Sequence, residues 1–185
     1  MRALNATIGL LFLVASAGQV QAADASDFKP FTSREGRFTI SFPGKPESKM
    51  STIKSTTGEM EMHVFQVGQP PDKESFTLTY NDLSPEAIKG DPDKVLDVVR
   101  DGGVDLTHGK VKRETKIAKS DKNPLTRDLE IEIRGVTTYS RFVLADNRLY
   151  VIMAYPDGTQ GTPERAKLFL DSFKVARDEA AGRAR

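Results

Sequence analysis

Two neighbouring apolar segments, residues 138–145 and 149–155, constrain the fold more than any other part of the chain. Asp146-Asn147 lies between them, and both residues tolerate the positive φ values of a tight hairpin. Each segment is apolar at odd and at even positions: Phe142 and Leu144 against Tyr139 and Val143, then Leu149, Val151 and Met153 against Tyr150, Ile152 and Ala154. Strands of this kind lie at the centre of a sheet that is covered on both sides. The sequence therefore predicts a buried hairpin inside a layered fold.

Other segments show the alternation of half-buried strands. Residues 37–42 and 76–82 place one apolar set on one face, namely Phe38, Ile40 and Phe42, then Phe76, Leu78 and Tyr80. A polar strand is expected at about 49–56, a longer one at 59–67, a weakly alternating one at 110–119 and a cleanly alternating one at 128–134. Pro43-Gly44 predicts a turn after the first of these strands.

Two helices are predicted from their starting residues. Asp91 is a good N-cap, Pro92 fits the first turn, and Gly102-Gly103 is expected to end this helix. Thr162-Pro163 begins the second helix in the same way. Its apolar stripe is Ala166, Phe169, Leu170 and Phe173.

These elements predict an α+β domain with a central antiparallel sheet flanked by helices, that is, an α/β/α sandwich. The 185 residues divide into a signal peptide at 1–22, a linker at 23–35, one domain at 36–175 and a frayed C-terminal tail at 176–185.

The first 22 residues carry an export signal. Arg2 is their sole charge, an apolar run from Ile8 to Ala17 follows, and Val20-Gln21-Ala22 supplies a cleavage site. The run is too short to span a bilayer, and no later segment approaches that length. We expect a periplasmic or secreted protein without a transmembrane segment in the mature chain.

Composition excludes several classes of chemistry. There is no Cys, so a disulfide framework, a thiolate metal site and a cysteine nucleophile are excluded. The chain has 27 Lys+Arg against 26 Asp+Glu, and this balance argues against a nucleic-acid binder. No cofactor is predicted.

The segment Gly36-Arg-Phe-Thr-Ile-Ser-Phe-Pro-Gly-Lys-Pro46 resembles the first strand and turn of exported bacterial domains with the PsbP-like (Mog1/PsbP) fold. The order of later segments agrees, from Phe76-Thr-Leu-Thr-Tyr80 through the helix ending in Arg100-Asp101-Gly102 and the hairpin around 147–150 to Phe169-Leu-Asp-Ser-Phe173. The resemblance covers nearly all of residues 36–175. It implies the fold, and it implies a non-enzymatic accessory or binding role without carrying over any functional residue.

Two surface segments are candidate binding sites. The stretch 110–127 is basic, and Lys110, Lys112 and Lys116 within it are able to dock an anionic surface or an acidic protein patch. The alternative is a lysine-rich edge strand that resists aggregation. Pro70-Pro71 makes the loop 68–74 stiff enough for recognition, and the alternative is an ordinary connection.

Metal sites and catalytic sites have weaker support. Met60, Met62 and His63 include ligand types that suit copper, but strand alternation places both methionines on the face opposite His63. Asp91, Asp93, Asp97 and Asp101 lack the spacing of a calcium loop, so we expect a helix cap and solvated helix surface. Asp128, Glu130, Glu132 and Arg134 share one strand face, which suits acid–base work on a sugar but is more typical of the wet side of a sheet.

The sequence thus favours an exported, non-enzymatic binding or accessory domain of the bacterial cell envelope. Its expected partner is an envelope protein or an anionic surface. A small-molecule or metal carrier is the alternative, and it would need an apolar pocket near Tyr139, Tyr150 and Tyr155. A hydrolase with dispersed catalytic residues is the third class, although neither His63 nor His108 lies in a recognisable triad context.

Overall fold

The computed structural model describes residues 27–55, 58–68, 74–121, 123–156 and 162–176. The predicted signal peptide, Pro70-Pro71 and nearly all of the predicted tail lie outside these residues. The elements are β1 (Phe28–Ser33), β2 (Phe38–Pro43), β3 (Glu47–Ser55), β4 (Gly58–Val67), β5 (Ser75–Asp82), α1 (Pro92–Thr107), β6 (Lys110–Ile117), β7 (Leu125–Ile133), β8 (Val136–Ala145), β9 (Arg148–Tyr155), α2 (Pro163–Asp171) and β10 (Lys174–Val175).

Seven strands form one antiparallel sheet in the order β3-β4-β5-β9-β8-β7-β6, and β1-β2-β10 form a smaller sheet. The predicted hairpin joins β8 to β9 near the middle of the large sheet, where Leu144 pairs with Leu149 across the turn. Asp146 has a φ of 56°, as the turn chemistry predicts. The α+β class and the antiparallel sheet are confirmed.

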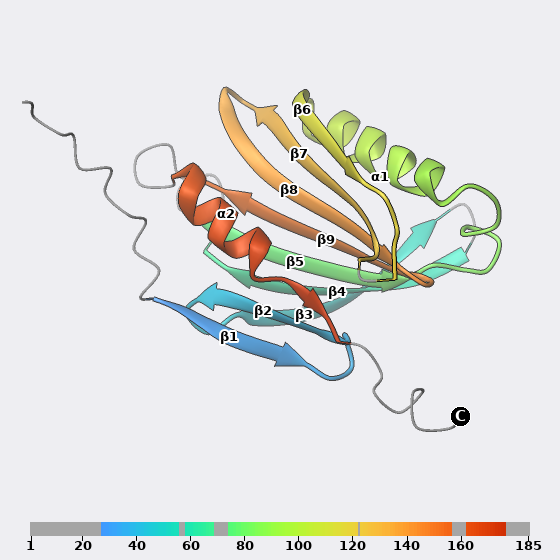
Figure 1. Cartoon of the computed structure of the whole chain (residues 1–185), viewed down its shortest axis with the longest axis horizontal. Helices are drawn as coiled ribbons and strands as arrows, with labels where there is room; N and C mark the ends of the chain where they lie inside the picture. The colour runs from blue at the N-terminus through green and yellow to red at the C-terminus, as the bar shows by residue number, and fades with distance from the viewer. Residues whose placement is uncertain (1–26, 56–57, 69–73, 122, 157–161, 177–185) are drawn as a thin grey trace, which may run out of the picture.

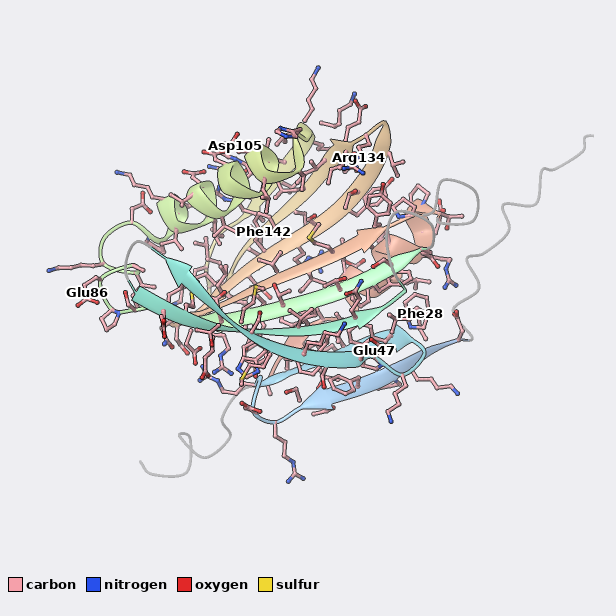
Figure 2. The ribbon with its side chains drawn as sticks, turned by 180° about the vertical axis from the view of Figure 1, so that it is seen from behind. Phe28, Glu47, Glu86, Asp105, Arg134 and Phe142 are labelled. Carbon is pink, nitrogen blue, oxygen red and sulfur yellow. The ribbon has the colours of Figure 1, made fainter. Side chains whose placement is uncertain are left out.

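The two helices lie on opposite faces of the large sheet (Figure 1). On the α1 side, Leu96 packs with residues of β7, β8 and β9, and Phe142 lies beneath the helix (Figure 2). On the α2 side, Ala166, Phe169 and Leu170 pack with Tyr150, Ile152 and Ala154 of β9 and with Phe38, Ile40 and Phe42 of β2.

The simple α/β/α sandwich needs correction because the α2 side carries more than a helix. The small sheet β1-β2-β10 covers part of that side, and the side chains of Phe38, Ile40 and Phe42 on β2 are fully buried. On the other side α1 contacts β7 and β8. The layers are therefore one helix, the seven-stranded sheet, and a mixed layer of α2 with the small sheet.

Three local predictions were wrong. Phe28–Ser33, expected to be irregular linker, forms β1, whose Phe28 and Phe31 pack against the core without strict alternation. Helix α1 continues through Gly102-Gly103 to Thr107, because Val104 packs into the core beneath it and tertiary packing overrides the low propensity of glycine. Helix α2 ends at Asp171, so Phe173 packs into the core from beyond the helix.

Candidate functional site

The basic stretch predicted to bind is divided between two faces of the sheet. Strand β6 is the last strand of the seven-stranded sheet, and Lys110, Lys112 and Lys116 are exposed on it. Lys112 pairs with Glu132 at 3.1 Å on the α2 side. Lys116 is opposite Arg127 in the ladder, on the α1 side. The structure therefore does not bring the three lysines together on one face.

Arg127, counted with the basic stretch, is fully buried. Its guanidinium donates to Asp97, to the Asp93 carboxylate at 2.8 Å and to the Asp93 carbonyl oxygen at 2.8 Å. This hydrogen bonding holds the pKa of Asp97 below its ordinary value. Asp93 and Asp97 are therefore anchors of α1 to the sheet, which corrects their expected role as solvated helix surface. Asp91 caps the helix as predicted, accepting from the Asp93 backbone N–H at 3.0 Å.

Three further arginines each fasten an outer segment to the large sheet. Arg148 holds Asp82 with two bonds of 2.6 Å and donates to the Glu35 carbonyl oxygen at 2.6 Å, next to the β1–β2 turn. Arg165 of α2 binds Asp27 and Glu74. The fourth, Arg141, lines an open surface cavity of about 610 Å³.

That surface is a groove on the α2 side, between strands β6 to β8 and the segment from α2 to β10. It consists of two cavities of about 610 Å³ and about 390 Å³, and we call the two together the α2-side groove. Arg141 lines both cavities, so its side chain forms the partition between them. The groove exists because α2 and the small sheet cover β9 and β5 but stop short of β6.

The partition is held rigidly. Arg141 donates to both oxygens of Asp128 at 2.7 and 2.8 Å, to the Leu170 carbonyl oxygen at 2.7 Å and to Asp171 at 3.0 Å. These charge-assisted hydrogen bonds offset the desolvation cost of burying the Arg141 guanidinium. Because the Leu170 carbonyl lies at the C-terminal end of α2, Arg141 also places a positive charge where the helix dipole favours one.

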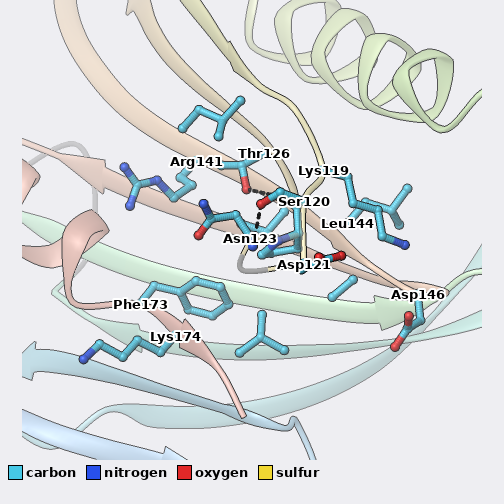
Figure 3. A pocket seen from close by; sticks show the side chains of 15 residues that line it. Lys119, Ser120, Asp121, Asn123, Thr126, Arg141, Leu144, Asp146, Phe173 and Lys174 are labelled. Carbon is cyan, nitrogen blue, oxygen red and sulfur yellow. Dashed lines mark hydrogen bonds between the residues drawn. The ribbon is translucent and has the colours of Figure 1, made fainter. Parts of the chain in front are cut away.

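The larger cavity combines apolar and polar walls. Figure 3 shows Phe173 and Lys174 across from Ser120, Asn123 and Thr126. The apolar lining comes from Ile117, Pro124, Val143, Ala145, Phe173 and Val175, and the charged rim from Lys119, Asp121, Asp146 and Lys174. Such a surface is able to hold an apolar side chain and to orient polar groups beside it.

Two of the three carboxylates with a possible acid–base role, Asp128 and Glu130, line the smaller cavity. Asp128 is held by Arg141, and Glu130 by Arg113, while Glu132 further along β7 is held by Lys112. Arg134 lies in the turn after β7 with a φ of 51°, so it does not share their strand face as expected. Burial, with Glu130 nearby, raises the pKa of Tyr139 at this cavity.

The three tyrosines named for a carrier pocket do not lie together on one face of the sheet. Tyr150 is fully buried, and its hydroxyl donates to the Gly36 carbonyl oxygen at 2.8 Å. Tyr139 lines the smaller cavity, whereas Tyr155 occupies the opposite face of β9 from Tyr150 because side chains alternate along a strand.

The histidines lie away from the groove. His63 stacks on Tyr80 with 4.4 Å between ring centroids. Met50, rather than Met60 or Met62, is its cross-strand neighbour, and the Met60 sulfur accepts a hydrogen bond from Asn81. His108 is the C-cap of α1. Among the described residues no cluster of three or more His, Cys, Asp or Glu side chains is arranged to hold a metal ion.

The groove residues Arg141, Asn123 and Thr126 were missed by sequence reasoning. Arg141 had a signal, since a lone arginine within a strand apolar on both faces must find carboxylate partners. Asn123 and Thr126 had none, because the shape of the groove depends on where α2 ends.

The geometry is that of a known fold. The chain is similar to the solution structure of cyanobacterial PsbP (CyanoP) from Synechocystis sp. PCC 6803, with a TM-score of 0.52 and 9% identity over 88% of this chain and 98% of that one. No family model and no curated protein matches the sequence. The chain therefore has a PsbP-like fold, as the sequence resemblance predicts. Neither helix in the described part of the chain has the length and hydropathy of a membrane span.

Proposed function

We propose that this chain is an exported, non-enzymatic binding domain of the cell envelope, and that the α2-side groove is its binding surface for a partner protein. The observation that carries the proposal is the pair of cavities, about 610 and 390 Å³, joined at Arg141. The walls mix apolar side chains with amide, hydroxyl and charged groups, which is the composition of a recognition surface. The predicted export signal supports the location, and the PsbP-like fold supports the accessory role.

A protein segment suits this groove better than an enclosed small ligand. The groove is open to solvent, and Arg113 and Thr115 of the edge strand β6 line its smaller cavity. Small-molecule sites enclose most of their ligand. Arg141 already makes four hydrogen bonds within the protein, so it serves as a wall.

Blocking the groove tests the proposal. Ala145→Trp fills the larger cavity, and Val98→Trp adds the same side chain on α1, on the opposite face, where Val98 is 72% exposed. After cross-linking of tagged protein in its native envelope, we expect one stoichiometric partner with the wild type and with Val98→Trp, and loss of it with Ala145→Trp.

A second pair of variants tests the groove without the bulky tryptophan, which by itself could prevent folding. Lys119→Glu with Lys174→Glu reverses two rim charges of the groove, and Lys29→Glu with Lys94→Glu reverses two exposed charges elsewhere. Capture that survives both groove variants contradicts the proposal. Capture lost only when Lys110, Lys112 and Lys116 are reversed places recognition on the β6 edge alone.

A further inference from the structure

Strand β6 brings an open sheet edge and the groove together. It is the last strand of its sheet in the described part of the chain, where the backbone groups on its outer side have no partner strand. A bulge between Val111 and Arg113 disturbs the first part of the strand. From Arg113 to Ile117 the register with β7 is continuous, which leaves a regular edge for another chain to pair with.

Alternate β6 side chains line the two cavities of the groove. Arg113 and Thr115 line the smaller cavity, and Ile117 lines the larger. A strand added beside β6 would project every second side chain to this same side. Consecutive side chains of that set would therefore lie at the mouths of the smaller and the larger cavity.

The charges at this edge are unbalanced. All four carboxylates of β6 and β7 are already paired: Glu114 with Arg100, Asp128 with Arg141, Glu130 with Arg113 and Glu132 with Lys112. Lys110, Lys116 and Lys119 have no carboxylate within ion-pair distance among the described residues. The surplus at the edge is positive, so it complements a negatively charged chain.

We propose that the partner segment is an acidic extended peptide that adds a strand to the β6 edge and places alternate side chains in the two cavities. Main-chain hydrogen bonds to β6 would supply affinity and the cavities specificity, as in other cases of strand addition. This inference rests on the proposed function, because it names the chemistry of what the groove binds.

Amide hydrogen exchange followed by NMR tests the inference directly. The probe is a capped peptide of alternating Glu and Val, as long as β6, which has 8 residues. The matched control peptide replaces Glu with Lys. We expect the Glu peptide to slow exchange at amides of 113–117 while amides of the opposite edge strand β3 are unaffected, and to bind at least about tenfold more tightly than the Lys peptide.

Reversing the charges of lysines at the β6 edge is a second test of the inference. The variant with Lys110→Glu, Lys116→Glu and Lys119→Glu should bind the Glu peptide about tenfold more weakly, and the variant with Lys29→Glu, Lys45→Glu and Lys89→Glu should bind it as the wild type does. These control lysines are exposed and lie outside β6 and outside the lining of both cavities.

The outcomes separate the two proposals. No slowed exchange in β6 at about millimolar peptide, or equal binding of both peptides, overturns strand addition. If capture of a native partner is still lost with Ala145→Trp, the groove remains the binding surface and only its occupant was wrong. If capture is also insensitive to the groove variants, both proposals fail.

Discussion

Replacing Arg127 by Met should destabilise the protein far more than the same change at a surface arginine. Arg127 is fully buried and binds two carboxylates of α1. Removing one partner of a buried ion pair costs about 3–5 kcal/mol. Here Asp97 would keep its ion pair with Arg100 at 3.2 Å. The carboxylates of Asp93 and Asp97 are also 45% and 37% exposed, so water would solvate them and reduce the cost.

We expect a loss of about 2–3 kcal/mol in the free energy of unfolding, with a fall of about 5–10 °C in the unfolding midpoint for a chain of this size. Urea denaturation followed by circular dichroism measures it. The control is Arg113→Met, whose side chain is 71% exposed in its pair with Glu130, and which should cost less than about 1 kcal/mol. Equal losses in the two variants would refute the role of Arg127 as the anchor of α1.

Three further predictions concern the end of the fold near the β1–β2 turn. Hydrogen bonds from Arg148 hold the pKa of Asp82 below its ordinary 3.8. The stability that the Asp82 carboxylate contributes is therefore complete above pH 3.8 and is lost as the pH falls through the lower folded pKa. Asp82→Asn should lower the free energy of unfolding at pH 7 but lose less stability on acidification than the wild type, and urea titrations at a series of pH values check this. Gly36→Ala should cost about 1–3 kcal/mol, because its Cβ would lie 2.5 Å from Phe38 and 2.8 Å from the Tyr80 ring; an unchanged urea midpoint would contradict it. Tyr80→Phe removes a buried hydroxyl without a partner in the described residues and should leave stability equal or higher, whereas Tyr150→Phe removes a bonded hydroxyl and should cost about 1 kcal/mol; the reverse order in thermal unfolding would show this reading to be wrong.

Local patterns predicted which face each strand buries, because that choice depends on neighbouring residues. Phe38, Ile40 and Phe42 are buried together, and Asp146-Asn147 forms the expected turn. The N-caps at Asp91 and Thr162 follow from side-chain chemistry that acts over three residues.

These local patterns could not predict which strands pair across the sheet. Strand β5 pairs with β9 rather than with its successor in the chain, and nothing local to either strand encodes that choice. The burial of Arg127 likewise depends on where α1 crosses β7, so a residue that looked like part of a basic surface became a buried anchor. The groove likewise depends on long-range packing, because α2 ends at Asp171 and leaves β6 uncovered.

Site-specific photo-cross-linking tests the central claim, that the α2-side groove is the binding surface, most directly. A photoreactive residue is placed at position 174, on the rim of the larger cavity, and in a separate variant at position 94, exposed on α1. We expect irradiation in the native envelope to join one partner segment to position 174 and none to position 94. The same adducts from both positions, or adducts from position 94 alone, would contradict the account.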